Sequence, residues 1–529
     1  MSDLNDPTNI ELESNKAFIN SKIWKLQKDF YKNQGISAWV GKVPFYITSN
    51  CFLARKYAEM LINLISDGLR NKTFNPKYPI YIFELGSGSG KFGYHLINDL
   101  MQCRKDVQDI ELDIRYVMTD LCPKNIEFWK KHNQLKDMVI DGILDMGIFD
   151  ADYCNDINTE FAKKTIGKNS LQNPPIVIGN YFLDTISCDL LRFNKGSITQ
   201  GDLSISTNVD NYSNNMVKDL KALDISYSFS EFNEKKIVNK DYLKVINYYK
   251  KHIHDSAVIM PTTVFKIVDF FSRTNKKNKA FFLFSDKGHV GLESLQLSQK
   301  PHFAFHGSFS LMVNFHALNL YYNIKKNSDV IIQDDGEGMS IIGFAANETY
   351  DNFGLFKNRF MKYANEFNVQ NFMNLKNFYM DKIDTLSINE MVALLSLSNY
   401  DSKILLDIAN HFVQKLSSIS VKMKHNILSN LKKIERNHFF LPNKENTIFE
   451  LARVNYCLGN YAESVRLYKI SIKYYGESLE TLFNMGLSAY YADKKTIALE
   501  CLEKLVKIDQ NDQEAKDWVE RIKKELKLA

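Results

Sequence analysis

Apolar and polar positions alternate along the first 350 residues in a pattern that predicts strands and helices in turn. Helical spacing of apolar residues predicts helices at 50–68, 92–103 and 124–132. Compact apolar runs predict buried strands at 78–85, 114–119, 139–143, 175–179 and 280–285. Because strands that alternate with helices are typical of a parallel sheet, the pattern predicts an α/β fold.

Two hairpins are predicted beside these strands. Residues 190–193 and 197–206 are strand-like, and the intervening Asn194-Lys195-Gly196 favours a tight turn. The second turn is DDGEG at 334–338, between VIIQ and MSIIGFAA. Two acids beside glycines suit a metal loop, but the EF-hand spacing is absent, so a plain hairpin turn is favoured.

After about residue 350 the strand patterns end and helical patterns continue to the C-terminus. Small residues recur at a spacing of 34 residues, as at Ala452 and Gly486, which is typical of tetratricopeptide repeats. Residues 514–528 can form the polar capping helix that such repeats need. The sequence therefore predicts three parts, namely an α/β domain at 1–350, a helical linker domain at 351–446 and an all-α repeat domain at 447–529.

Charge and cysteine content narrow the function classes. The chain has 67 basic and 62 acidic residues, and this near balance without a dominant block argues against nucleic-acid binding. Seven scattered cysteines without a C-x-x-C pair argue against a disulfide framework and a zinc site. The polar N-terminus resembles no signal peptide, and no stretch approaches 18 apolar residues. We expect a cytoplasmic protein with no membrane segment and no bound metal.

A glycine loop, ELGSGSG at 84–90, follows a predicted strand and opens a predicted helix. Glycines at alternate positions let the backbone turn tightly and approach a nucleotide-like ligand. A phosphate-binding P-loop does not fit, because Phe92 stands where that loop needs Ser or Thr. A dinucleotide fingerprint is formally present from Gly88 to Gly93, but it would place the end of the strand too late.

S-adenosylmethionine is the ligand that these residues favour. It carries an α-amino group and a sulfonium instead of a pyrophosphate, so a carboxylate at Glu84 suits it. Asp120, at the end of the next strand, can accept both ribose hydroxyls, and Asp145, after the third, can accept the adenine amino group. The alternative for Asp120 is a helix cap. The predicted cofactor-binding residues are Glu84, Gly86, Ser87, Gly88, Gly90, Asp120 and Asp145.

Polar residues also end the fourth predicted strand, in NYFLD at 180–184, where ligands bind in open α/β sheets. Methyl transfer from a sulfonium mainly requires a positioned acceptor and the handling of one proton. Asn180 offers a carbonyl oxygen to an amine or guanidinium and Asp184 offers a carboxylate, so both are predicted catalytic residues. The alternative is that Asn180 ends the strand and Asp184 caps a helix. His289, His306 and His316 lack the spacing of a ligand set, so packing or surface roles are favoured for them, and His306 is the first candidate if one of them acts as a base.

Taken together, these motifs resemble the MidA-like methyltransferases, relatives of the mitochondrial complex I assembly arginine methyltransferase. ELGSGSG resembles their E-L-G-x-G-x-G, and the other matching segments, at 45–49, 180–184, 286–288 and 311–315, resemble D-F-x-T-x, N-E-L-L-D, D-Y-G and A-H-V-D-F. The resemblance covers about residues 35–345. It implies a class I, Rossmann-like methyltransferase domain with an inserted hairpin and helices, and S-adenosylmethionine as cofactor.

Four positions depart from the family pattern. Phe45, Tyr181, Lys287 and Asn314 stand where the family has Asp, Glu, Tyr and Asp. Characterised relatives methylate a protein arginine, and a guanidinium needs carboxylates to hold and polarise it. The departures therefore argue against a simple transfer of arginine specificity, while the cofactor loop is intact.

Three functions stay open at this point. The leading hypothesis is a protein methyltransferase, because a repeat domain that can bind a protein substrate or partner is joined to a methyl-transfer fold. The second is a small-molecule methyltransferase with purely structural repeats. The third is a non-catalytic adaptor that binds S-adenosylmethionine and has lost its acceptor chemistry.

Overall fold

The computed structural model describes residues 9–41, 43, 45–106, 112–213, 216–296, 298–325, 327–333, 338–442 and 445–527. The chain forms two compact units, which are described separately. The first comprises Met1–Ser49 and Leu53–Gln370, and the second comprises Asn50–Phe52 and Asn371–Ala529. The three domains predicted from the sequence, with limits at 350 and 446, stay a prediction.

The first unit contains a seven-stranded sheet in the order β19-β20-β14-β7-β2-β3-β4. Its strands are β2 (Ile80–Leu85), β3 (Ile114–Asp120), β4 (Leu144–Ile148), β7 (Ile176–Asn180), β14 (Ala280–Asp286), β19 (Asp329–Gln333) and β20 (Ser340–Ala346). The five strands from β14 to β4 are parallel, whereas β20 runs antiparallel to both of its neighbours. The predicted α/β sheet is thus confirmed as a mixed sheet, and the carboxyl ends of five strands meet at one edge.

One predicted strand is wrong. Residues 139–143 do not form a strand, because helix α6 (Asn133–Ile140) covers the start of this run and β4 begins at Leu144. The apolar run is short enough to suit the end of a helix, where Ile140 is exposed, and periodicity alone does not separate the two states. The predicted hairpin of β19 and β20 is confirmed, while residues 334–337 of its turn lie outside the described residues.

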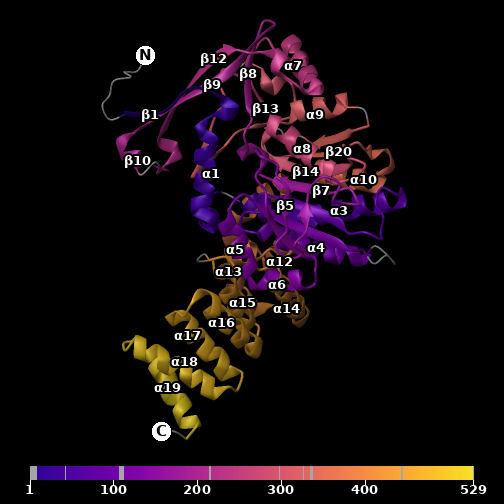
Figure 1. Cartoon of the computed structure of the whole chain (residues 1–529). Helices are drawn as coiled ribbons and strands as arrows, with labels where there is room; N and C mark the ends of the chain where they lie inside the picture. The colour runs from indigo at the N-terminus through magenta and orange to yellow at the C-terminus, as the bar shows by residue number, and fades with distance from the viewer. Residues whose placement is uncertain are drawn as a thin grey trace. The chain divides into compact units, whose positions relative to one another are not determined.

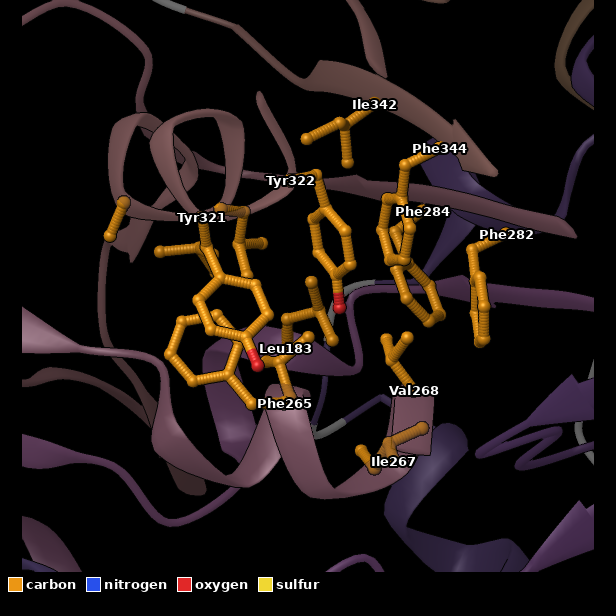
Figure 2. Packing of buried hydrophobic residues seen from close by; sticks show 14 of the residues in the cluster. Leu183, Phe265, Ile267, Val268, Phe282, Phe284, Tyr321, Tyr322, Ile342 and Phe344 are labelled. Atoms are coloured by element: carbon orange, nitrogen blue, oxygen red, sulfur yellow. The ribbon is translucent and has the colours of Figure 1, made fainter. Parts of the chain in front are cut away.

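Helices cover both faces of the main sheet. On one face α3 (Cys51–Arg70) meets α4 (Lys91–Asp106), where the rings of Tyr57 and Phe92 lie 5.4 Å apart. On the other face α8 (Thr262–Thr274) and α9 (Phe315–Ile324) pack against β14 and β20. Phe344 stacks there on Phe282 and on Tyr322, with ring centroids 4.6 and 4.5 Å apart (Figure 2).

A second, antiparallel sheet builds on the predicted 190–206 hairpin, which is confirmed. Its strands are β1 (Asn9–Ala17), β8 (Asp189–Asn194), β9 (Ser197–Asn208), β12 (Leu223–Glu231) and β13 (Asp255–Met260). Figure 1 labels these five strands, with helix α7 (Lys240–His252) beside β8. The chain leaves β1 into α1 (Lys22–Gln34) and the short helix η2 (Gly35–Trp39). A separate hydrophobic cluster that includes Phe18, Trp24 and Phe309 holds α1 to this sheet.

Shorter elements complete the first unit. The helices are α2 (Tyr46–Ser49), α5 (Pro123–Lys131) and α10 (Gly354–Asn365). The strands are β5 (Ile157–Asn158), β6 (Thr165–Ile166), β10 (Tyr212–Ser213), β11 (Met216–Val217), β15 (Gly288–His289), β16 (Ala304–His306), β17 (Ser308–Ser310) and β18 (Val313–Asn314).

The C-terminal region is helical, as predicted, and Figure 1 shows its helices in orange to yellow. They are α11 (Val369–Met380), α12 (Ile388–Leu397), α13 (Ser402–Gln414), α14 (Val421–Arg436), α15 (Thr447–Cys457), α16 (Tyr461–Tyr475), α17 (Leu479–Tyr491), α18 (Lys495–Ile508) and α19 (Gln513–Glu525). The turns within the two pairs α15–α16 and α17–α18 both use a positive φ, at Gly459 and Asp493. Their identity as tetratricopeptide repeats stays a prediction. Within the described ranges, no helix is long and apolar enough to cross a membrane.

Candidate active site

The glycine loop connects β2 to α4 at the carboxyl edge of the sheet. Gly86, Gly88 and Gly90 have φ values of +66°, +54° and +79°, a region that other residues rarely adopt. A Cβ on Gly86 would lie 2.8 Å from Phe182, and one on Gly88 would lie 2.7 Å from the Trp39 indole. Both backbone conformation and close contacts therefore require glycine.

Asp120 fastens this loop to the end of β3. One of its carboxylate oxygens accepts the Gly88 N–H at 3.0 Å, and the other accepts the Cys122 N–H at 2.8 Å. The Ser87 N–H donates to the Thr119 carbonyl at 2.9 Å, which adds a second link to β3. Burial raises the pKa of Asp120 although three backbone N–H groups and Asn125 lower it. Asp120 thus fixes the glycine loop to the turn before α5, whose N-cap is Cys122, so Asp120 is not the cap of that helix. Its contact with the ribose stays a prediction.

Glu84 lies buried beneath the loop. Its carboxylate accepts the Tyr116 hydroxyl at 3.0 Å and faces Gly93, where a Cβ would come within 2.6 Å of it. Burial raises the pKa of Glu84 to about 7, with a contribution from the charge of Asp120. A carboxylate held in this way gains from a nearby cation, which would restore its ionised form.

Asp145 lies elsewhere than predicted. It sits inside β4 and not after the third strand, and its carboxylate accepts the backbone N–H groups of Phe161 and Ala162 at 3.0 and 2.9 Å. Asp145 therefore binds the backbone at residues 161 and 162, and within the described residues it makes no hydrogen bond to the glycine loop. The carboxylate just beyond the end of β4 is Asp150, which pairs with Lys28 of α1 at 2.7 Å.

Asn180 ends β7, and Asp184 follows it in a single helical turn. The Asn180 side-chain oxygen accepts the Tyr57 hydroxyl at 2.7 Å. Between them Tyr181 has φ +47°, a strained conformation for a residue with a Cβ. Leu183, beside Asp184, is buried in the aromatic core shown in Figure 2, which anchors this turn.

Asp184 forms a buried carboxyl pair with Asp286, the last residue of β14. The Asp184 N–H donates to Asp286 at 3.1 Å, and the Lys287 N–H donates to the other Asp286 oxygen at 2.9 Å. Burial raises the pKa of Asp184 to about 7, and burial together with the charge of Asp184 raises the pKa of Asp286 well above its ordinary value. The pair therefore holds a proton at neutral pH. One Asp184 oxygen, Oδ1, is buried without a hydrogen-bond partner.

The four departures from the family pattern have different surroundings. Burial raises the pKa of the Tyr181 phenol, and the charges of Asp286 and Asp184 raise it as well. Phe45 packs its ring against Trp39, with centroids 6.1 Å apart. Lys287 is exposed, and Asn314 is a buried cap that accepts the Ala317 N–H of α9 at 2.8 Å. Asn314 therefore has structural contacts, whereas Tyr181 lies within reach of the charges of the carboxyl pair.

His306 has a contact with the Ser310 hydroxyl at 3.4 Å, and burial lowers the pKa of its imidazole. Its Nδ1 is buried without a hydrogen-bond partner. His316 instead packs on Tyr249, with its Nδ1 2.9 Å from the phenol oxygen. No group of three His, Cys, Asp or Glu residues suited to a metal occurs within the part of the chain that the structure describes.

Residues of α1 and η2 were not predicted as part of the site. Tyr31 and Trp39 stack with centroids 6.0 Å apart, and Trp39 lies against Gly88. The segment GISAWVG has no periodic pattern and no chemical motif, so nothing in its own sequence indicates this position. It reaches the loop through contacts with residues far along the chain, such as Lys28 with Asp150.

No family model and no curated protein matches the sequence. Among solved structures, an uncharacterized protein from Burkholderia thailandensis is 12% identical, with a TM-score of 0.36, over 61% of this chain and 92% of its own. A second protein from Burkholderia thailandensis, a candidate methyl transferase bound to S-adenosyl-homocysteine, has the same identity and TM-score. The match covers 61% of this chain and 93% of that protein. The CurJ carbon methyltransferase is 9% identical, with a TM-score of 0.23, over 54% of each chain. These similarities are low, so the interpretation of the site rests on its own geometry.

Proposed function

We propose that this protein is an S-adenosylmethionine-dependent methyltransferase. The observation that carries the proposal is the glycine loop itself, which is fastened by Asp120 and lies over the buried carboxyl of Glu84. Backbone N–H groups at the start of a helix, a flanking acid and a second acid at the end of the next strand suit a nucleoside that carries an amino cation. The mixed α/β sheet is consistent with a methyltransferase fold.

The residues present fit this cofactor. Gly86, Ser87 and Gly88 would hold it against the backbone, Glu84 would attract its α-amino group, and Asp120 would face its ribose. When bound, the cofactor supplies a methyl group on a sulfonium. The protein then has to bind, orient and exclude water, which are the main tasks in an in-line transfer.

The acceptor site in this proposal is formed by Asn180 and the pair of Asp184 with Asp286. An amine or guanidinium must lose a proton when it is methylated, and a carboxylate with a pKa near 7 is suited to take it. Asp184 is such a group, and its Oδ1 has no partner within the protein. We favour a protein side-chain nitrogen, with arginine suggested by the MidA-like resemblance.

The C-terminal helices support a protein substrate or partner in this proposal. Helices α14, α15 and α16 enclose a hollow of about 290 Å³. Its lining is apolar at Leu428, Leu451 and Leu467 and charged at Lys424 and Glu435. A hollow with an apolar floor and charges of both signs suits an extended polypeptide.

Calorimetry with S-adenosylhomocysteine tests the cofactor, and radiolabelled S-adenosylmethionine in host lysate tests the acceptor. We expect micromolar or tighter binding, and label that runs with a protein band. Absence of binding would overturn the proposal. If the label appears only in small solutes, the protein is still a methyltransferase, but the proposal of a protein acceptor is rejected.

A further inference from the structure

The segment that runs from α1 through η2 is attached to three other elements of the first unit, two of which follow the strands β4 and β3 of the main sheet. Lys28 lies 2.7 Å from Asp150 and 2.5 Å from Asp152, just past β4. The Lys124 ammonium of α5 donates to the Asn33 carbonyl at 2.8 Å. Gln27 donates to the Phe309 carbonyl at 2.6 Å. With attachments on three separate elements, the segment is a fixed wall of the site.

Trp39, at the end of this wall, covers the middle glycine of the loop. Two carbons of its indole lie 2.7 Å from the position of a Cβ on Gly88, and its Nε1 lies 3.1 Å from it. In nucleotide-binding glycine loops the second glycine lets the backbone approach the ligand. The indole therefore borders the surface against which a cofactor would lie.

The Trp39 indole N–H has no hydrogen-bond acceptor although the nitrogen is buried. Buried donors normally have a partner, and one without a partner requires an explanation. The neighbouring Gly88 N–H already donates to the Asp120 carboxylate, so it does not compete with the indole N–H for an acceptor on a ligand. The site thus offers a donor from Trp39 beside an acceptor from Asp120, which is the combination that a nucleoside needs.

The rings around Trp39 hold it in place. Tyr31 stacks on it at 6.0 Å with an interplanar angle of 22°, and Phe45 meets it edge-on at 6.1 Å. The Tyr31 hydroxyl bonds Ser308, and its pKa is raised by burial and by the charges of Asp184 and Asp120. This stack therefore extends from the cofactor loop toward the acceptor carboxyls.

We propose that Trp39 is a cofactor-binding residue, whose indole covers the nucleoside of S-adenosylmethionine and donates its N–H to an acceptor atom of that nucleoside. This inference rests on the proposed function. It assigns to the N-terminal segment, which carries no recognisable cofactor motif, one wall of the cofactor site.

The test is calorimetry of the full chain with S-adenosylhomocysteine for Trp39→Phe and Trp39→Ala. Trp39→Phe keeps a ring and loses the N–H, so we expect binding about tenfold weaker, the scale of one buried hydrogen bond. Trp39→Ala also loses the stacked surface, and we expect a loss of about a hundredfold. Any change in tryptophan fluorescence that wild type shows on binding should be smaller in both variants, although Trp129 also lies beside the loop, at Gly90.

A matched control separates contact from stability. Trp24→Phe removes the indole N–H of α1, which donates to the Phe18 carbonyl at 2.8 Å away from the loop, and should bind within twofold of wild type. If both Trp39 variants bind as wild type does, or bind more tightly because the indole obstructs the site, the inference is wrong. If wild type itself does not bind, the proposed function fails first.

Discussion

The two halves of the site differ in how completely the protein satisfies its own buried carboxyl groups. At the glycine loop both Asp120 oxygens accept backbone N–H groups, and the Glu84 carboxyl accepts a hydroxyl. At the acceptor half Asp184 and Asp286 share a buried site, and Asp184 Oδ1 has no partner. A satisfied network fixes a backbone shape, whereas an unsatisfied buried carboxyl favours the arrival of a partner. The loop is thus a rigid cradle, and the carboxyl pair is poised for chemistry.

The largest effect is expected at the loop. Gly88→Val should abolish S-adenosylhomocysteine binding, because the new side chain would meet Trp39 and the φ of +54° disfavours it. The measurement is calorimetry, accompanied by circular dichroism to show that the protein is folded. Gly142→Val is the matched control, since its φ is +71° and nothing lies within 4 Å. Retained binding in Gly88→Val would show that the loop is not a cradle.

The next effect tests the acceptor half. Asp184→Asn should lower the turnover of methyl transfer by about a hundredfold while S-adenosylhomocysteine binding is unchanged, the pattern expected for a lost proton acceptor. In the native protein the rate should rise as pH increases through about 7, because the ionised carboxylate is the active form. A parallel loss of cofactor affinity would show that Asp184 serves the cofactor and not the methyl acceptor.

The same residue gives a stability test with a definite sign. Its folded-state pKa, about 7, is above the ordinary value, so folding favours the protonated form. Asp184 therefore costs the folded state stability progressively as pH rises from about 4 to above 7. Asp184→Asn should gain in Tm relative to wild type across that window, as measured by thermal unfolding at pH 5 and pH 8. An equal Tm difference at both values would contradict the raised pKa.

A smaller effect tests whether the Glu84 carboxylate meets the amino cation of the cofactor. With a pKa near 7, Glu84 is mostly protonated at pH 6 and mostly ionised at pH 8, so affinity for a cofactor with an amino cation should rise about tenfold between them. Glu84→Gln should remove this dependence. Calorimetry at the two values measures it, with Asp184→Asn as a control whose affinity keeps the wild-type profile. A flat wild-type profile would mean that Glu84 does not meet the cation.

The smallest effect concerns the C-terminal helices. Leu428→Glu places a charge in the apolar hollow of the second unit and should raise the KM for a protein substrate about fivefold, with cofactor affinity unchanged, because remote docking contributes uniform binding. Val421→Glu on the same helix, at a position that is 73% exposed, is the control. Identical KM values for both variants would reject docking at this hollow.

The cofactor half could be predicted because it is local in the sequence. Glu84 and the three glycines lie within seven residues, and Asp120 closes the next strand. The sequence pattern misplaces Asp145 because it predicts the strand about five residues too early, at 139–143, whereas the strand ends at Ile148. An error of that size moves a side chain from the carboxyl end of a strand, where ligands bind, to a position within the strand.

The acceptor half could be predicted only in part. Asn180 and Asp184 were found at a strand end, but the pairing of Asp184 with Asp286 joins residues about a hundred positions apart. Tyr57 and Trp39 come from segments without any motif, and their positions follow from packing. Local patterns carry no information on such contacts, because they depend on the complete topology.

The left-handed conformation of Tyr181 sets a limit on how this protein can be improved by engineering. Such a conformation costs a non-glycine residue on the order of 1–3 kcal/mol, so a glycine at this position should raise thermal stability. The same change would remove a phenol that lies beside the carboxyl pair. A selection for heat resistance alone would therefore favour a variant that has lost this phenol from the proposed acceptor site, and a search for stabilised variants of this fold should hold position 181 constant.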